Sequence, residues 1–332
     1  MSDAPHSTAE TPYADLSPET ILDALESAGF DPTGGLLELN SYENRVFQAE
    51  LESGGFVVTK FYRPGRWSDA QIAEEHAFSA ELAEADVPVV IPIERDGATL
   101  FRHAEHRFAV YPRQGGHPPN IEIESDLKVL ARTIARIHAV GATRRFEHRP
   151  DLSVEWLGHE SRRFLLEHQF LPPDMEAAYD TLTEQLLARL DDASTRLRRA
   201  PEGRIHGDCH LGNLLWRNDT PHFVDFDDCV NGPPIQDLWM LLSGEREERQ
   251  SQLKTIVEAY ETFHRFEPAS LGLIEPLRTL RIMHHAAWIA RRWHDPAFPR
   301  AFPTFDTPRY WSEHVLTLRE QMAALDEPPL SI

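Results

Sequence analysis

Short hydrophobic runs separated by polar turns occupy the first third of the chain, whereas later segments repeat with helical spacing. The runs at residues 36–39, 45–51 and 56–61 are rich in strand-forming residues and predict strands. A helix precedes them, because Ser17 can cap its first turn and Pro18 suits its first position. We therefore expect a small β-rich region that is followed by a larger helical region.

The same spacing rules predict the elements that come after this first sheet. Three more strands are expected at residues 87–93, 98–103 and 107–111, with Asp96-Gly97 as a turn. Helices are expected at residues 69–85, 127–141, 155–170, 174–199, 251–265 and 274–293, and another should start at Gln236. The segment after residue 293 is rich in aromatic residues and prolines, and we interpret it as a cover for the core.

A break in composition divides the chain. Prolines and glycines crowd residues 112–119, which we interpret as a hinge between two lobes. The predicted organisation is a disordered leader at residues 1–12, an N-terminal lobe at 13–111 and a C-terminal helical lobe at 120–332. A chain of 332 residues is long for one compact core, which agrees with two lobes. The expected fold class is α+β, with a small sheet-containing lobe and a large helical one.

Charge and cysteine content restrict the function classes. The net charge of −21 opposes binding to nucleic acid and to anionic membranes, although it would suit a cationic substrate. The polar start of the chain does not resemble a secretory signal, and no apolar run approaches the roughly 18 residues that would span a bilayer. Cys209 and Cys229 are too few for a disulfide framework, and we expect inert buried thiols. We therefore expect a cytoplasmic monomer without nucleic-acid or membrane partners.

One stretch carries the chemistry of phosphoryl transfer. Asp208 and Asn213 lie five positions apart in His-Gly-Asp-Cys-His-Leu-Gly-Asn, and Asp225 follows Asn213 by twelve positions at the end of an apolar run. A kinase needs a carboxylate that accepts the hydroxyl proton, and an amide and a second carboxylate that hold Mg²⁺ on the phosphates. Asp and Asn oxygens are hard donors that suit Mg²⁺. The pattern thus predicts an ATP-dependent kinase, with Asp208 as the catalytic residue and Asn213 and Asp225 as metal ligands.

The predicted sheet supplies candidate nucleotide-binding groups. Lys60 is the one lysine in an apolar strand, so it must reach solvent or an anion, and in a kinase it would bind the α- and β-phosphates. Its helix partner would be Glu75, with Glu74 as the alternative, because two neighbouring glutamates cannot both point inward. The connection 40–44 would cover the phosphates, yet it contains no glycine, so Ser41 and Asn44 would donate side-chain hydrogen bonds there unless the connection is a plain polar turn.

These motifs resemble the phosphotransferase motif of aminoglycoside, choline and homoserine kinases, and more closely that of the bacterial stress response kinase A family. The likeness extends over nearly the whole chain and includes residues 39–46, 60–64, 206–213, 236–242 and 288–299. It implies a bilobal protein-kinase-like fold and a cytoplasmic Ser/Thr protein kinase that uses ATP and Mg²⁺ in stress survival. It also implies that Asp208 is the proton acceptor, that Asn213 and Asp225 bind Mg²⁺, and that Ser41 and Lys60 bind ATP.

The acceptor and the reaction class have alternatives. Only eleven residues separate Asp225 from Asp237, which leaves no room for a long activation loop and resembles small-molecule kinases. The acceptor could therefore be an amino alcohol or an aminoglycoside-like molecule instead of a protein. A metal-dependent phosphohydrolase is a further alternative, since His206, Asp208 and His210 alternate as metal ligands on a strand can, and a nucleotide-binding protein without catalysis is another. In the kinase hypothesis, His206 orders the catalytic loop, and Asp237 caps that loop or helps to place His206.

Overall fold

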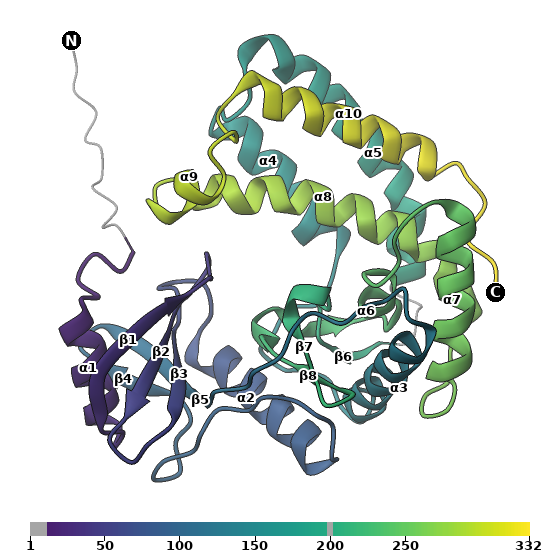
Figure 1. Ribbon diagram of the computed structural model, residues 1–332. Helices are drawn as coiled ribbons and strands as arrows, with labels where there is room; N and C mark the ends of the chain where they lie inside the picture. Colours follow the sequence, from purple (N-terminus) through teal and green to yellow (C-terminus); the bar gives the residue numbers. More distant parts are fainter. Residues whose placement is uncertain (1–11, 198–201) are drawn as a thin grey trace, which may run out of the picture. The chain divides into compact units, whose positions relative to one another are not determined.

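The computed structural model describes residues 12–197 and 202–332 of the chain. The predicted leader at residues 1–12 therefore lies outside the described residues, except for its last position. The chain forms two compact units, whose elements are labelled in Figure 1. The first unit contains the residues up to Asp69 together with Pro92–Arg113 and Arg292–Ala301, and the second contains Ala70–Ile91, Gln114–Arg291 and Phe302–Ile332.

The first unit is built on an antiparallel sheet of five strands in the order β1-β2-β3-β5-β4. Its elements are α1 (Pro18–Ser27), β1 (Pro32–Leu39), β2 (Arg45–Leu51), β3 (Phe56–Phe61), β4 (Phe101–His103), β5 (His106–Pro112) and α9 (Ala297–Ala301). Ser17 caps α1, because its hydroxyl accepts a hydrogen bond from the Thr20 N–H at 3.2 Å. Leu25 of α1 then packs with Phe61 and Phe108 of the sheet in one apolar core. The predicted helix and the first three predicted strands are confirmed.

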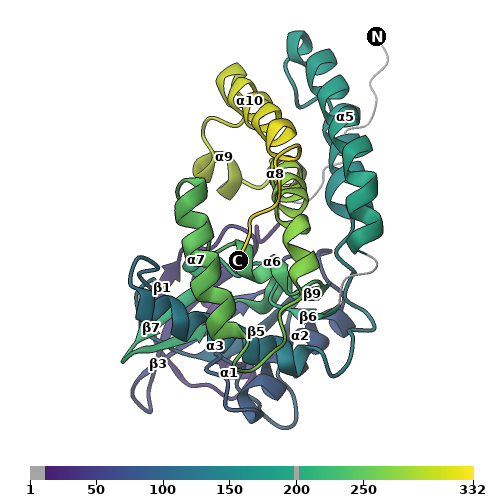
Figure 2. The same cartoon turned by 90° about the vertical axis from the view of Figure 1, so that its right-hand side faces the viewer.

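The second unit is mainly helical and contains two short two-stranded sheets, β6-β9 and β7-β8. Its helices are α2 (Asp69–Glu84), α3 (Glu124–Gly141), α4 (Glu160–Glu167), α5 (Pro173–Leu197), α6 (Ile235–Trp239), α7 (Arg246–Tyr260), α8 (Ile274–Arg291) and α10 (Pro308–Ala324). Its strands are β6 (Gly203–Ile205), β7 (Leu214–Arg217), β8 (Thr220–Phe223) and β9 (Val230–Gly232), and short helical turns lie at Glu155–His159, Leu211–Asn213, Phe226–Asp228 and Pro268–Leu273. α3 packs beside α7, and α8 packs beside α10 (Figure 2). In the described part of the chain, every helix is too short or too polar to cross a membrane.

The prediction of a strand at residues 87–93 is wrong. Pro88 and Pro92 interrupt this segment, and proline has no N–H to donate to a strand ladder. The segment instead makes an isolated bridge between Val89 and Phe223. It thereby runs along the end of β8 without joining a sheet as a strand.

The aromatic segment after residue 293 is more regular than its composition indicates. Thr307 caps α10, since its hydroxyl accepts a hydrogen bond from the Tyr310 N–H at 3.4 Å, and Pro308 occupies the first helical position. Trp311 is fully buried, so the interpretation of these aromatic residues as core cover is confirmed at that position. Thr307 and Pro308 are a helix-start signal in the sequence, but the other prolines of this segment made it look irregular.

The compact units differ from the sequence-based division in two places. α2 belongs to the second unit from Ala70 onward, although the sequence pattern assigned it to the N-terminal lobe. Residues 292–301 follow α8 in the chain but belong to the first unit. The hinge at residues 112–119 stays a prediction.

Candidate active site

The catalytic segment starts where β6 ends. β6 pairs with β9, β7 pairs with β8, and residues 206–213 connect the two short sheets. Gly207 has a φ of +83°, and a Cβ at this position would lie 2.2 Å from the carbonyl oxygen of Asp228. A side chain therefore cannot be accommodated there. The close approach brings the chain just before Asp208 against the segment that follows Asp225.

Asp237 of α6 holds the catalytic loop by its backbone. Its two carboxylate oxygens accept hydrogen bonds from the N–H groups of His206 at 2.9 Å and Gly207 at 2.8 Å. The same carboxylate accepts from His138 Nε2 at 2.9 Å, so His138 Nδ1 is left to accept from the Tyr260 hydroxyl at 2.8 Å. All three supporting side chains are buried, which makes these bonds costly to lose. The prediction that Asp237 caps the loop is confirmed.

His206 orders the loop from inside the core, as predicted. Its Nε2 lies 3.0 Å from the Val224 carbonyl oxygen, and its ring centre lies 4.5 Å from that of Phe226. Residues 206–210 form no strand in the structure. The alternating set of metal ligands on a strand, which the phosphohydrolase alternative required of His206, Asp208 and His210, is therefore not built.

Both carboxylate oxygens of Asp208 have partners. Oδ1 lies 2.6 Å from Nη2 of Arg281, a residue of α8. Oδ2 lies 3.4 Å from His210 Nε2 and 3.4 Å from Asn213 Nδ2. The Asn213 amide nitrogen also donates to the Asp208 backbone carbonyl at 3.0 Å. The side chain of Asp208 is thus held from two sides, by the loop itself and by α8.

These partners set the charge of Asp208. Burial alone would raise the pKa of this carboxyl group, but the hydrogen bond from His210 and the positive charge of Arg281 outweigh burial, so the pKa lies well below its ordinary value. Asp208 is therefore ionised at neutral pH and is a weak base. A weak base is sufficient for phosphoryl transfer, in which positioning contributes most of the rate.

Asn213 and Asp225 lie at the open end of the β7–β8 hairpin. The Val224 N–H donates to the Asn213 carbonyl at 3.1 Å, which fixes the residue before Asp225 beside Asn213. The amide nitrogen of Asn213 faces Asp208, so its side-chain oxygen lies on the opposite edge of the amide. Asp225 is exposed and has a left-handed backbone, φ 59° and ψ 64°, a conformation that Asp tolerates better than most residues. An amide oxygen and an exposed carboxylate fit Mg²⁺, which completes its shell with water and phosphate oxygens.

The two glutamates of α2 have different roles within the second unit. Glu74 accepts three backbone N–H groups of residues 147–149 at distances between 2.6 and 3.0 Å. Glu75 faces the buried side of α2, as predicted, and its Oε2 lies 3.2 Å from Nη2 of Arg149. Arg149 also donates to the carbonyl of Asp227 at 2.7 Å. Arg149 thereby connects α2 to the segment that follows the predicted metal ligands.

Ser41 and Lys60 belong to the first unit. Lys60 is buried in β3, where it pairs with Val46 of β2, and its Nζ lies 5.1 Å from the ring centre of Tyr62. Ser41 is half-buried in the connection between β1 and β2. The nucleotide contacts of Ser41 and Lys60, and the pairing of Lys60 with Glu75, stay predictions.

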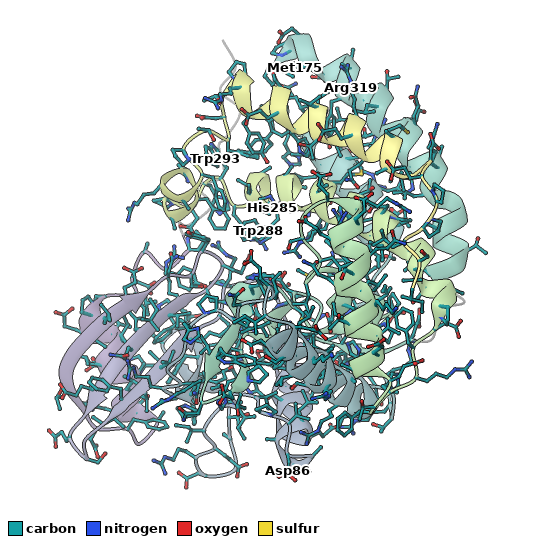
Figure 3. All side chains as sticks on the ribbon, turned by 45° about the vertical axis from the view of Figure 1, so that its right-hand side comes forward. Asp86, Met175, His285, Trp288, Trp293 and Arg319 are labelled. Carbon is teal, nitrogen blue, oxygen red and sulfur yellow. The ribbon has the colours of Figure 1, made fainter. Side chains whose placement is uncertain are left out.

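Arg149 and Arg281 escaped the sequence analysis. Arg149 lies in an irregular segment, and no local pattern indicates its contacts with Glu75 and with the Asp227 carbonyl. Arg281 shares one face of α8 with His285 and Trp288, labelled in Figure 3, because positions four and three apart lie together on a helix. The rings of His285 and Trp288 stack with their centres 5.6 Å apart. The helical spacing could have placed Arg281 on this aromatic face, but not its distant partner Asp208.

Both cysteines flank the catalytic residues and are fully buried. Cys209 follows Asp208 directly, and Cys229 comes just before β9. Burial raises the pKa of both thiols. Both side chains therefore stay protonated at neutral pH, and the expected burial is confirmed.

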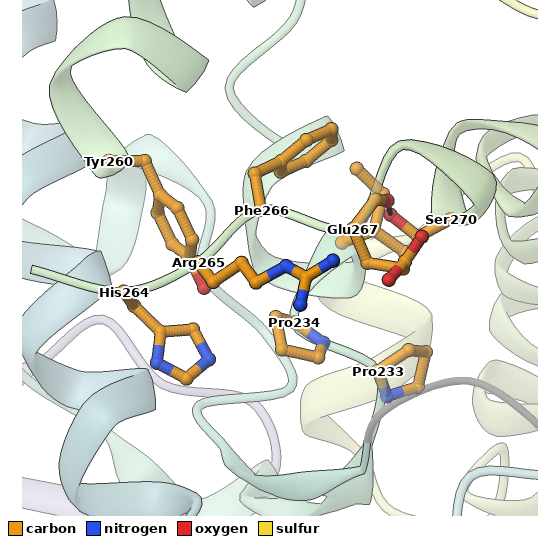
Figure 4. A pocket seen from close by; sticks show the side chains of 9 residues that line it. Pro233, Pro234, Tyr260, His264, Arg265, Phe266, Glu267 and Ser270 are labelled. Atoms are coloured by element: carbon orange, nitrogen blue, oxygen red, sulfur yellow. Dashed lines mark hydrogen bonds between the residues drawn. The ribbon is translucent and has the colours of Figure 1, made fainter.

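A small pocket in the second unit lies at the far end of the hydrogen bonds that support the loop (Figure 4). Tyr260 lines this pocket together with Pro233, His264 and Phe266, and Tyr260 also contacts His138. None of the residues that line the pocket belongs to the catalytic loop. The pocket therefore touches the support of the loop and not the loop itself.

Comparisons with known proteins agree with this geometry. The sequence model described as "Phosphotransferase enzyme family" matches residues 36–274. The chain is 44% identical over 326 residues to stress response kinase A of Salmonella choleraesuis (strain SC-B67), with 96% of this chain and 97% of that protein covered. It is also 44% identical over 326 residues, with the same coverage, to the serine/threonine protein kinase RdoA of Salmonella typhimurium (strain LT2).

A solved structure shares the fold. The amicoumacin kinase hAmiN, in complex with AMP-PNP, Ca²⁺ and Ami, aligns with a TM-score of 0.72 over 94% of each chain, at 18% sequence identity. At this identity the likeness concerns the fold alone. It confirms the expected α+β fold of the kinase-like type.

Proposed function

The chain belongs to the phosphotransferase enzyme family and is a kinase, and from this premise we propose that it transfers the γ-phosphoryl group of ATP to Ser and Thr hydroxyls of proteins. The proposal is supported by the identity, over nearly the whole chain, to relatives named stress response kinase A and serine/threonine protein kinase. We extend it to Mg²⁺ as the cofactor and to a role in stress survival.

The second unit provides the groups for the chemical step. Asp208 orients the acceptor hydroxyl and takes its proton as the hydroxyl oxygen bonds to the γ-phosphorus. The bond between that phosphorus and the β–γ bridging oxygen breaks, and ADP leaves with this oxygen. Asn213 and Asp225 hold Mg²⁺, which when bound neutralises charge on the phosphate oxygens.

Three further residues bind or orient the nucleotide in this proposal. Ser41 and Lys60 bind the phosphates, and Glu75 orients Lys60. Glu75 is a better partner for Lys60 than Glu74, because the Glu74 carboxylate already accepts three backbone N–H groups. Arg149 positions Glu75 through its charged contact at 3.2 Å.

One observation carries the proposal: the catalytic loop is built around an ionised carboxylate. Asp208 is held by Arg281 and by the amide of Asn213, and Asp237 fixes the backbone just before it. A proton acceptor and an amide are thereby preset in one short segment. A binding protein without catalysis has no need for a preset proton acceptor.

The segment from Asp225 to Asp237 bears on regulation. It forms the turn Phe226–Asp228 and then β9, which pairs with β6. Every residue between Asp225 and Asp237 is described, and none forms a long activation loop. We therefore expect no control by phosphorylation of such a loop.

The first prediction tests the proposed acceptor and base together. Wild-type protein, labelled ATP and Mg²⁺ are incubated with generic protein substrates and, separately, with a panel of amino alcohols and aminoglycosides. We expect label on protein Ser and Thr, and Asp208→Ala should reduce the transfer by about 10²–10⁴-fold because it removes the proton acceptor. Asp225→Ala should also lose binding of the metal–nucleotide complex.

The matched control is Asp219→Asn, in the exposed turn of the β7–β8 hairpin, which should transfer at the wild-type rate. Circular dichroism shows whether each variant keeps its fold. Near-normal transfer by a folded Asp208→Ala variant would show that this carboxylate does not have the proposed role.

A small-molecule acceptor is the second candidate. The net charge of −21 favours a cationic acceptor, and the amicoumacin kinase shares this fold. Label on the amino alcohols or aminoglycosides, with none on protein, would favour this candidate.

A further inference from the structure

The first unit contains a group of buried and half-buried charges that the proposed reaction does not use. No member has more than 14% of its side chain exposed. The group, hereafter the arginine cluster, consists of Arg45, Arg63, Arg66, Arg292, Glu43 and Asp295. Its members come from the connection after β1, the start of β2, the segment after β3, and the segment after α8. Buried charges are expensive unless they are well paired, so the arrangement calls for a functional reason.

Asp295 is the centre of one half of the cluster. Its Oδ1 lies 2.8 Å from Nη2 of Arg45, and its Oδ2 lies 2.5 Å from Nη2 of Arg63. The Ala297 N–H also donates to Oδ1, at 3.0 Å. Burial alone would raise the pKa of Asp295, but these donors outweigh burial and lower it. Asp295 therefore stays charged and holds both arginines in place.

Glu43 is the centre of the other half, and it lies in the connection 40–44 itself. Its carboxylate is 2.9 Å from Arg63 Nε and 2.5 Å from Arg292 Nε, with Arg66 Nε at 3.9 Å. Burial alone would raise the pKa of Glu43, but the charges of the three arginines outweigh burial and lower it. Arg63 thus contacts both carboxylates of the cluster.

The arginines that Asp295 holds are bound to the backbone of the connection 40–44. Arg63 Nε donates to the Glu43 carbonyl at 3.0 Å. Arg45 Nη1 donates to the carbonyls of Tyr42 at 3.3 Å and Asn44 at 3.4 Å. Three successive carbonyl groups are therefore turned toward the cluster.

This orientation determines where the amide groups point. The C=O and N–H of one trans peptide unit point in opposite directions. With the carbonyls of residues 42–44 on the cluster, the N–H groups of residues 43–45 point away from it. The connection 40–44 contains no glycine, and none of its residues, all of which the structure describes, has a positive φ. The arginines thus do what glycine does elsewhere, where its backbone freedom lets amides turn toward a phosphate.

We propose that the arginine cluster presets the connection 40–44 for the phosphates of the nucleotide, with Arg63 and Asp295 as positioning residues. The inference rests on the proposed function, in which this connection covers the nucleotide. The cluster contributes by directing backbone N–H groups of the connection to one side.

The test compares two carboxylates of the first unit. Asp295→Asn removes the charge that holds Arg45 and Arg63. Asp69→Asn is the matched control, since Asp69 also contacts two arginines, Arg102 and Arg107, but its side chain is 52% exposed. Calorimetric titration with AMP-PNP and Mg²⁺ measures affinity, and steady-state kinetics separates the KM for ATP from kcat and from the KM for the acceptor.

We expect Asp295→Asn to weaken AMP-PNP binding by about tenfold or more, because loss of positioning alone commonly has effects of this size. The KM for ATP should rise with it, whereas the KM for the acceptor should stay unchanged. Asp69→Asn should match the wild type in all three measurements. A general loss of stability would not separate the two KM values in this way.

The outcomes separate this inference from the proposed function. If the wild type does not bind AMP-PNP, the proposed function fails first, and the inference falls with it. If the wild type binds but folded Asp295→Asn binds within twofold of it, the proposed function stands and the inference is wrong. Should Asp295→Asn fail to fold, Arg45→Met removes the two carbonyl contacts of Arg45 instead, and unchanged binding by that variant overturns the inference equally.

Discussion

The connection 40–44 and the catalytic loop 206–213 are both held by charged side chains, but by opposite backbone groups. In the first unit, arginines take carbonyl groups of residues 42–44. In the second unit, the carboxylate of Asp237 takes the N–H groups of His206 and Gly207. One loop is therefore fixed through its acceptors by cations, and the other through its donors by an anion.

The difference corresponds to the charge of what each loop is proposed to bind. Fixing carbonyls leaves a loop that presents N–H groups, which suit the anionic phosphates. Fixing N–H groups leaves a loop that presents oxygen atoms of Asp208 and Asn213, which suit a proton and Mg²⁺. A side chain that supports a loop can therefore also determine whether the loop presents positively or negatively polarised groups to its ligand.

Among variants that test the difference between the two loops, we expect the largest effect from Asp237→Asn. An amide in place of the carboxylate can accept at only one atom, so at least one buried N–H loses its partner. We expect kcat to fall by about 10²-fold through misplacement of Asp208, and the free energy of unfolding to fall by about 1–3 kcal/mol. AMP-PNP affinity should change little, which is the reverse of Asp295→Asn. Kinetics, calorimetry and denaturant unfolding measure the three quantities. If Asp237→Asn and Asp295→Asn changed kcat and AMP-PNP affinity in the same way, the proposed difference between the two loops would be wrong.

A smaller effect is expected from Arg281→Ala, through the pKa of Asp208. In the wild type the pKa is held low, so Asp208 stays ionised in mild acid. Without Arg281 the effect of burial is less opposed, the pKa rises, and the proton-accepting form is lost at a higher pH. Activity normalised to its plateau should therefore begin to decline at a higher pH in Arg281→Ala than in the wild type when the buffer is acidified.

Arg278→Ala is the control for this pH profile. Arg278 lies one turn earlier on α8 and contacts Glu275 and the ring of Trp239 instead of Asp208. Its profile should overlay that of the wild type. An acidic limb that does not move in Arg281→Ala would show that the ion pair does not set the pKa of the base.

The smallest effect is expected from Ser41→Ala in the connection 40–44. If the arginine cluster presets the backbone, the Ser41 hydroxyl adds one hydrogen bond to a site that is already formed. The KM for ATP should rise only about three- to tenfold, with kcat nearly unchanged. Ser53→Ala, in the β2–β3 turn of the same sheet, is the matched control. A loss as large as that of Asp295→Asn would mean that the hydroxyl, and not the backbone, dominates phosphate binding.

Local signals in the sequence predicted much of the fold. The cap at Ser17, the strand-forming runs of the first sheet and the helical spacing of α3 and α8 each depend on neighbouring residues, and all three were found. The strand at residues 87–93 failed because its apolar content outweighed the two prolines in the interpretation. α10 was missed because prolines concealed a Thr-Pro cap.

The residues of the candidate site likewise differ in whether a local sequence pattern predicts them. Asp208, Asn213 and Asp225 were proposed from a short motif, since chemistry and spacing occur together there. Arg281 lies 73 positions from its partner Asp208, and the arginine cluster joins segments about 250 positions apart. Contacts over such separations leave no local pattern, so only the folded chain reveals them.

The two buried thiols have a consequence for an enzyme proposed to work under stress. Peroxides and disulfides react with the thiolate form of cysteine, and Cys209 and Cys229 are kept as neutral thiols, out of contact with solvent. Oxidants therefore have no reactive sulfur to attack in the segment that performs the transfer. The sulfur chemistry that would inactivate a more exposed catalyst is suppressed here by packing alone.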